Sequence, residues 1–373
     1  MSDPINLEKC ASWVGLDRIR RASIYYVRIP LKRPYSLSFS TLYVFNTILC
    51  MLETEESMLW GESTPLPGYG WEGPEDVWER SLKAAEEIIG LRADEAFLKL
   101  YRISEITPFS MAALMGALEQ KALYAYLDHA FAVRTIGMLL AETREALGEE
   151  VTSLAESGFD TLKIKVGRDV NFDIQRIETV LDHLDAAQHL RIDANQGLDR
   201  EGAVRLWDAS NHSNVEYLEQ PFPSQDWESI VRLLKLRPDV RICLDESVWL
   251  DDDLKTVEQL DGDVSVKLKL MKHASAMRTW SMARRLQKSN LRVTLGNGVQ
   301  GELGALAEIG LYRMLGLDSP AESNGFAKQS TSIVKDYPMR ISKGRIIHSQ
   351  WDREITLADD FQRRLVRSWQ RPE

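Results

Sequence analysis

The sequence predicts an α/β protein, a modified (β/α)7β barrel of the TIM type with an α+β capping domain. The first observation is a rhythm after about residue 130, where short apolar strands alternate with helical segments. The second is that charged residues stand near the carboxyl ends of five consecutive strands. The third is that strand-like runs precede helices in the first 130 residues, which is typical of a small α+β unit.

The chain divides into three predicted regions. Residues 1–130 form the capping domain, with strands at 24–31, 42–53 and 58–62 and amphipathic helices near 75–90 and 109–129. Residues 131–325 form the barrel with the metal site, and residues 326–373 return to the capping domain. Loops at 34–41 and 65–71 are expected to cover the barrel mouth, where they would exclude water and select the substrate.

The spacing of the barrel strands gives one strand and one helix per step. Comparable points on the last six strands are separated by 24 to 28 residues. This rhythm fits either a doubly wound sheet or a barrel, but five consecutive strands with charge at one rim indicate a barrel with a site at its mouth. The predicted strands are 133–139, 161–166, 190–194, 217–220, 242–246, 264–270 and 293–296.

The composition narrows the class of partner and the location. The chain has 46 basic and 56 acidic residues, a formal net charge of −10, which argues against nucleic acid or an anionic membrane as a partner. The three cysteines, at positions 10, 50 and 243, are far apart and read as reduced thiols. The first residues contain no apolar signal region, so we expect a cytoplasmic protein.

Three carboxylates stand at three successive strand ends. Asp193 lies in RIDANQG, Glu219 in YLEQP and Asp245 in CLDES, so a closed barrel would bring them together. Converging carboxylates repel one another unless a cation binds them, and oxygen ligands suit a hard ion, so we expect Mg²⁺. Each acid could instead cap the following helix or pair with a lysine. Three acids at equivalent positions favour the metal site over those alternatives.

Lysines flank the predicted metal site from two sides of the barrel. Lys163 and Lys165 share one face of a strand, and Lys267 and Lys269 share one face of another. A lysine among other cations and partly desolvated has a lowered pKa, so it can serve as a general base. Metal, carboxylates and lysine bases together suit abstraction of a proton α to a carboxylate, through an enediolate. Salt bridges between these lysines and the acids are also expected.

The motifs, taken together and in order, resemble the enolase superfamily, in the muconate lactonizing enzyme subgroup that includes the dipeptide epimerases. The matching segments are GFDTLKIKVG, RIDANQG, YLEQP, CLDES and VSVKLKLMK, with RIPLKRPYSLSFST and LWGESTPLPGYG resembling capping-domain strands and a substrate loop. The resemblance implies that Asp193, Glu219 and Asp245 are Mg²⁺ ligands. It also implies that Lys165 and Lys269 are the two acid/base residues.

The same resemblance implies residues for substrate binding. Lys163 matches the lysine that supports the substrate carboxylate, and Asn195 matches a residue behind the metal ligands. Asp318 matches one aspartate of the DxD motif of dipeptide epimerases, whose partner is replaced here by Gly316. Gly298, in the glycine-rich loop after the seventh strand, is a further candidate for substrate binding.

Several positions depart from the family pattern. Lys267 stands where relatives usually have a small polar residue, and Gln300 where a glutamate is common. Alternation along the strand predicts that Glu246 points away from the metal, so it is left out of the ligand set. The loop before the helix that begins near Gly301 could bind a carboxylate at the helix N-terminus.

The predicted function is a racemase or epimerase of an amino-acid derivative or dipeptide, acting on a small-molecule carboxylate as a homo-oligomer. A cycloisomerase or a dehydratase/lyase, of the muconate cycloisomerase or o-succinylbenzoate synthase type, is the alternative, because those reactions need only one base. A Schiff-base aldolase would not need three carboxylates. A scaffold without activity would be expected to lose at least one acid or lysine.

Overall fold

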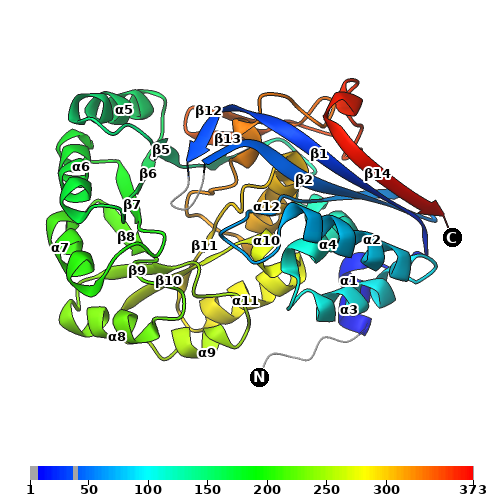
Figure 1. Ribbon diagram of the computed structural model, residues 1–373, viewed down its shortest axis with the longest axis horizontal. Coiled ribbons are helices and arrows are strands. Elements are labelled where there is room, and N and C mark those ends of the chain that lie inside the picture. The colour runs from blue at the N-terminus through cyan, green and yellow to red at the C-terminus, as the bar shows by residue number, and fades with distance from the viewer. Residues whose placement is uncertain (1–6, 37–40, 373) are drawn as a thin grey trace.

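The computed structural model describes residues 7–36 and 41–372, and its centre is a curled parallel sheet (Figure 1). Seven strands of the described chain lie in this sheet in sequence order, which confirms the predicted α/β fold class. The strands are β5 (Gly137–Leu139), β6 (Thr161–Lys165), β7 (His189–Asp193), β8 (Val215–Glu219), β9 (Arg241–Leu244), β10 (Asp263–Leu268) and β11 (Arg292–Leu295).

Helices connect the strands and cover the outer face of this sheet (Figure 1). Several begin at a side-chain cap, as at Asp169, Asp199 and Ser275, whose oxygens accept backbone N–H groups of the first turn. The helices are α5 (Arg144–Glu156), α6 (Val170–His183), α7 (Arg200–Ser210), α8 (Trp227–Leu236), α9 (Asp253–Val257), α10 (Leu270–His273), α11 (Ala276–Lys288) and α12 (Glu302–Leu315).

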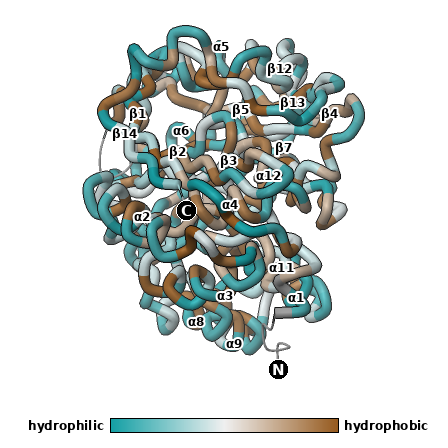
Figure 2. Tube along the Cα trace, turned by 90° about the vertical axis from the view of Figure 1, so that its right-hand side faces the viewer, coloured by the Kyte–Doolittle hydropathy of each residue, from teal (hydrophilic) through white to brown (hydrophobic). Residues whose placement is uncertain are grey.

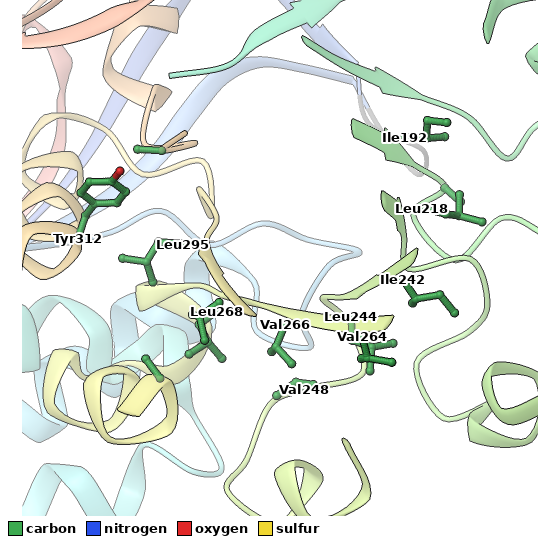
Figure 3. Packing of buried hydrophobic residues seen from close by; sticks show 14 of the residues in the cluster. Ile192, Leu218, Ile242, Leu244, Val248, Val264, Val266, Leu268, Leu295 and Tyr312 are labelled. Carbon is green, nitrogen blue, oxygen red and sulfur yellow. The ribbon is translucent and has the colours of Figure 1, made fainter. Parts of the chain in front are cut away.

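Alternation along the strands separates an apolar outer layer from a polar interior. Figure 3 shows Ile192, Leu218 and Ile242 among the buried apolar side chains that pack in one cluster. The residues that alternate with them along the strands, such as Arg191 and Tyr217, are also buried, and their side chains face the inside of the barrel. The guanidinium group of Arg191 lies 5.4 Å from the centroid of the Tyr217 ring. The interior of the sheet therefore carries the charges.

The eighth position of the barrel is filled by a segment with a single β-bridge. Ala321 bridges Thr135 in the parallel direction, and its N–H donates to the carbonyl of Arg134 at 2.9 Å. The predicted strand at 133–139 is two strands, because β4 (Phe131–Arg134) pairs with β13 (Arg345–His348) and only β5 joins the parallel sheet. This arrangement brings residues near 322 beside the start of the barrel.

An antiparallel cap covers one side of the parallel sheet (Figure 1). Its sheet has the order β14 (Leu365–Pro372), β1 (Ile19–Ser36), β2 (Thr41–Thr54) and β3 (Met58–Ser63), so the end of the chain returns to its beginning. Its helices are α1 (Leu7–Val14), α2 (Pro74–Ile88), α3 (Ala93–Ile103) and α4 (Pro108–Tyr124). The division at residues 130 and 325 stays a prediction that these pairings support.

Smaller elements complete the chain. A three-stranded antiparallel sheet contains β12 (Met339–Ser342), β13 (Arg345–His348) and β4, and two 3-10 helices, η1 (Gly325–Lys328) and η2 (Phe361–Arg364), follow the barrel. Hydrophilic and apolar stretches alternate along α2, α3 and α8 in Figure 2, as expected for helices with one buried face. Along the described ranges, no helix has both the length and the apolar character that crossing a bilayer requires.

Candidate active site

A single pocket at the mouth of the barrel brings together most of the predicted site residues. Lys163, Lys165, Asp193, Lys269 and Gly298 all line it. The cap contributes Tyr35, Leu66 and Tyr69 to its wall. Tyr69 lies in the predicted covering loop 65–71, whereas part of the other loop, residues 37–40, lies outside the described residues.

Two of the predicted metal ligands are linked by one lysine. Asp193 ends β7 and Glu219 ends β8, and the strand register places these two residues side by side. Lys163 Nζ lies 2.9 Å from Asp193 Oδ2 and 2.9 Å from Glu219 Oε2, and all three side chains are buried. Burial raises the pKa of Asp193, but Lys163 and Lys165 outweigh it and hold that pKa below its ordinary value.

The third carboxylate, Asp245, follows β9 directly and is held by two lysines and a tyrosine. Lys269 Nζ lies 2.6 Å from Oδ2, Lys272 Nζ lies 3.2 Å from Oδ1, and Tyr69 Oη donates to Oδ1 at 2.9 Å. Burial raises the pKa of Asp245, but the two ammonium groups lower it far more. Asp245 is therefore ionised throughout the neutral range.

The oxygens at the mouth fit a hard cation. As the side chains stand in the described part of the chain, no three acidic, histidine or cysteine residues are grouped to hold an ion, because lysine ammonium groups lie against the carboxylates. Two buried oxygens nevertheless receive no hydrogen bond, Asn195 Oδ1 and Glu246 Oε2. Unpartnered buried oxygens are costly without a cation or donor, so this set suits Mg²⁺.

Glu246 lies closer to the metal ligands than alternation predicts. β9 ends at Leu244, so the two-residue period stops before Glu246. Asn195 Nδ2 donates to Glu246 Oε1 at 3.2 Å. Burial and the charge of Asp245 raise the pKa of Glu246 to about 7. The expectation that this side chain points away from the mouth is wrong.

Lys165 and Lys269 reach the pocket from strands that lie on two sides of the barrel. Lys165 ends β6, Lys269 follows β10, and three strands separate them in the sheet. Burial lowers the pKa of Lys269, but Asp245 and Tyr69 raise it well above its ordinary value. The expectation of a lowered pKa is wrong for Lys269, because its nearest charged neighbour at 2.6 Å is a carboxylate rather than another cation.

Asp318 lies outside this pocket. It lines a different hollow, together with residues that begin the strands, such as His189 and Arg241, at the opposite end of the barrel. Its backbone carbonyl accepts a hydrogen bond from Arg134 at 2.7 Å. The structure therefore does not place Asp318, which was predicted to bind substrate, in the pocket with the other predicted site residues.

The segment that follows Asp318 places a different carboxylate, that of Glu322, in the wall of the pocket at the barrel mouth. Its Oε1 accepts from Arg191 at 2.9 Å and from Lys267 at 2.8 Å, and Lys163 Nζ lies 3.4 Å from Oε2. Lys267 is fully buried and also contacts Glu219. The strand rhythm could have found Glu322, since a further step of 24 to 28 residues from Thr294 ends near it.

The N-terminus of α12 is already occupied by the protein. Glu62, at the end of β3, accepts hydrogen bonds from the backbone N–H groups of Gly301 and Gly304, the latter at 3.0 Å. A helix N-terminus favours a carboxylate, as expected, but the carboxylate comes from the cap. The prediction that this terminus binds a carboxylate is confirmed, and the carboxylate is that of Glu62 from the protein itself.

Comparison with known proteins identifies the family to which the chain belongs. A family model described as "Enolase C-terminal domain-like" matches residues 146–350, more than half of the chain, and the protein belongs to that family. The resemblance to the enolase superfamily is confirmed.

Individual relatives cover nearly the whole chain. N-succinyl-L-Arg/Lys racemase of Bacillus cereus is 22% identical over 372 residues, which cover 93% of this chain and all of that protein. The crystal structure of the N-succinyl Arg/Lys racemase from Bacillus cereus has a TM-score of 0.83 at 20% identity, covering 95% of this chain and 99% of the other. The sequence comparison supports the predicted isomerase class, and the structural comparison supports the fold.

Two further solved structures have the same fold. A dipeptide epimerase from Cytophaga hutchinsonii, complexed with Mg and the dipeptide D-Ala-L-Val, has a TM-score of 0.81 at 20% identity and covers 95% of this chain and 99% of its own. Muconate lactonizing enzyme from Pseudomonas putida has a TM-score of 0.81 at 21% identity and covers 93% and 99%.

Proposed function

We propose that the protein is a Mg²⁺-dependent racemase or epimerase that moves the proton α to the carboxylate of an amino-acid derivative or dipeptide. The observation that carries this proposal is that Lys165 and Lys269 line one pocket from two sides of the barrel. Two bases on the two faces of a planar enediolate can remove a proton from one face and return one to the other. The relatives named above, a racemase and an epimerase among them, support the same reaction class.

Asp193, Glu219 and Asp245 would hold the metal ion, which when bound supplies positive charge that stabilises the charge developing on the substrate carboxylate. Lys163, buried between two of these acids, would support the same carboxylate. Coordinated Mg²⁺ in the epimerase from Cytophaga hutchinsonii supports this choice of ion.

The remaining residues move the proton and exclude water. In the arrangement seen, Lys269 is an ammonium ion, so it is suited to donate a proton, and it becomes a base only when the charge of Asp245 is engaged by another cation. Lys165 would act on the opposite face. Leu66 and Tyr69, from the cap, close the pocket above both lysines and reduce the access of water.

The test is exchange of the α-proton in D₂O with each enantiomer of N-acylated amino acids and with dipeptides. The wild-type protein should exchange either enantiomer, whereas Lys165→Ala and Lys269→Ala should each retain exchange from one enantiomer at most. Racemisation should fall by about a hundredfold to ten-thousandfold in each variant, the usual contribution of a positioned acid or base. Lys32→Met, an exposed lysine outside the pocket, is the matched control. Normal exchange of both enantiomers by both alanine variants would contradict the two-base assignment.

A cycloisomerase or lyase is the second candidate, and the raised pKa of Lys269 favours it. A lysine that stays protonated can act by its charge alone, and elimination or cycloisomerisation needs only one base. Ring closure or loss of a leaving group, seen by mass spectrometry or NMR of the products, would select this candidate. The predicted homo-oligomer and the cytoplasmic location stay predictions.

A further inference from the structure

We propose that the pocket contains a second anion site, formed by Lys328 with Tyr35 and Asn324, which binds a second carboxylate carried by the substrate. This inference rests on the proposed function, because it places the α-carboxylate at Lys163 and the metal. It adds the class of substrate, a molecule with two carboxylates rather than one with a free ammonium group.

The geometry around Lys328 is that of an uncompensated cation in the wall of the pocket. Lys328 ends η1, its Nζ donates to Asn324 Oδ1 at 2.7 Å, and it lies 4.9 Å from the centroid of the Tyr35 ring. These three residues line the same pocket as Lys165. Among residues 7–36 and 41–372, no carboxylate forms an ion pair with Lys328. Within the same described residues its hydrogen-bond partner is a neutral amide, that of Asn324, which leaves its charge available to a ligand.

The surroundings of Lys328 make an anion more favourable there. Burial lowers the pKa of Lys328, Tyr35 opposes this change, and the nearby charge of Lys165 lowers it further; the smaller opposing contributions of Glu308 and Glu322 do not restore its ordinary value. Lys165 Nζ lies 6.0 Å from the centroid of the same Tyr35 ring, so two ammonium groups flank one aromatic side chain. A bound carboxylate would offset both the burial and the repulsion between the two cations.

The pocket has no carboxylate left for a substrate ammonium. Glu322 is the acid closest in sequence to this part of the wall, and both of its oxygens already face cations: Arg191 and Lys267 at Oε1, and Lys163 at Oε2. Asp193, the other acid in the lining, is bound by Lys163. A free amine would therefore meet Lys165 and Lys328 rather than an acid, which disfavours it.

The charge balance points to a dianion. Four lysines line the pocket, and two of them, Lys163 and Lys269, are paired with acids. Within the part of the chain that the structure describes, Lys165 and Lys328 form no ion pair. A substrate with one carboxylate engages the metal end of the pocket and leaves Lys328 uncompensated. A second carboxylate, on an N-acyl group or on the side chain, would compensate it.

The experiment measures binding and needs no turnover. Isothermal titration with Mg²⁺ present compares N-succinylglycine with N-acetylglycine, which differ in the terminal carboxylate of the acyl group. A second pair, N-acetylglutamate and N-acetylglutamine, differs in a side-chain carboxylate. We expect the wild-type protein to bind one dianion about tenfold to hundredfold more tightly than its monoanionic partner, the usual range for a hydrogen bond to a charged group.

Variants assign the preference to Lys328. Lys328→Met should abolish it, Lys328→Arg should retain most of it, and Lys32→Met, which removes an exposed lysine that contacts Ala327 close by, should leave it unchanged. If only N-succinylglycine binds more tightly than its partner, the second carboxylate of the substrate is on the acyl group. If only N-acetylglutamate binds more tightly than its partner, the second carboxylate is on the side chain. Equal binding within both pairs, absence of binding, or a preference that survives in Lys328→Met would overturn the proposal.

The outcome is separable from that of the proposed function. Tighter binding of a dianion that depends on Lys328, with no α-proton exchange from any compound, would support the anion site and contradict the proposed racemase or epimerase activity. Exchange of the α-proton in both the neutral-acyl and the acidic compounds, with no effect of Lys328→Met on affinity, would support the racemase or epimerase activity and contradict the anion site.

Discussion

Buried carboxylates at the barrel mouth and at the seam between cap and barrel have opposite electrostatic surroundings. At the mouth, Asp245 and Glu322 face lysine and arginine side chains, which hold their pKa values well below the ordinary range despite burial. At the seam, Glu62 and Glu119 face backbone N–H groups of α12 and α11, and burial raises their pKa values, that of Glu119 to about 7. Full charges outweigh burial at Asp245 and Glu322, whereas amide dipoles do not at Glu62 and Glu119.

The difference separates reactive from structural acids. An ammonium group on a flexible lysine can turn away when a metal ion or substrate arrives, so the mouth carboxylates can exchange partners. Backbone N–H groups cannot turn away, so Glu119 holds α11 against α4, with Ser275 Oγ donating at 2.8 Å and the N–H groups of Ala276 and Met277 at 2.7 Å. We therefore expect mouth substitutions to change activity and seam substitutions to change stability.

The largest expected effect concerns the carboxylates at the mouth of the barrel. Glu219→Gln or Asp245→Asn should lower Mg²⁺-dependent activity by at least about a thousandfold, since the charge stabilisation supplied by a metal amounts to several kcal/mol. Titration calorimetry should show weakened Mg²⁺ binding, and thermal unfolding should show a folded protein. Full activity after removal of metal by a chelator would contradict the assignment of these acids as ligands.

The next prediction tests the seam. Glu119→Ala removes the acceptor of three buried hydrogen bonds and should lower the free energy of unfolding by about 3–5 kcal/mol, because buried donors without partners are costly. Activity per folded molecule should change little at a temperature well below the transition. Glu145→Ala, an exposed acid in the first turn of α5, is the control and should change stability by less than about 0.5 kcal/mol. A loss of activity without a loss of stability in Glu119→Ala would break the distinction between the two regions.

A third prediction concerns the fully buried Lys267, which faces both Glu219 and Glu322. Lys267→Met leaves two buried acids with fewer cations and should cost about 3 kcal/mol of stability. Glu322→Gln alone should also destabilise, and the double variant should recover part of the loss, because the two residues compensate one another. Strictly additive losses in urea unfolding would show that Lys267 and Glu322 are not coupled.

The sequence predicted the residues that regular strands carry and missed those that irregular segments carry. Lys165 and Asp193 follow from alternation and spacing, because both end a strand. Asp318, which the sequence predicts to bind substrate, lies outside the pocket, whereas Glu322 lines it; the sequence does not show this because the eighth barrel position has one bridge and no long apolar run to mark it. Tyr35 lies in the segment 34–41 that the sequence predicts to cover the mouth, whereas Lys328 ends a 3-10 helix, where no period predicts which side chains face the pocket.

The contacts at the seam were equally inaccessible to sequence reasoning. Glu62 and Gly304 are 242 residues apart, and Glu119 and Met277 are 158 residues apart. A glutamate in a strand or helix has the same local signature whether it faces water or caps a distant helix. Only the packing of α4 on α11 and of β3 on α12 shows that these acids are buried and bound to backbone.

The smallest expected effect tests an acid between the two regions, Glu308. It lies on α12, is 1% exposed, and its Oε1 has no hydrogen-bond partner in the described chain, while Asn297 Nδ2 lies 3.4 Å from Oε2. Burial, with a further contribution from the charge of Glu62, raises the pKa of Glu308 to about 8. The native protein therefore keeps a proton on Glu308 near neutral pH that the unfolded chain, with a pKa of about 4.3, has released.

Because the native state binds the extra proton, this contribution to stability is complete below about pH 4 and is lost as the pH rises through 8. Between pH 7 and pH 9 the wild-type protein should lose about 1.4 kcal/mol through this group, the equivalent of one pH unit below its pKa. Glu308→Gln resembles the protonated acid in shape and does not titrate, so its stability should fall less over that interval. Urea unfolding at both pH values measures the difference, with Glu145→Gln as a control expected to follow the wild-type curve. Parallel curves for wild type and Glu308→Gln would show that Glu308 is already ionised at pH 7, with a partner as strong as those of the mouth acids.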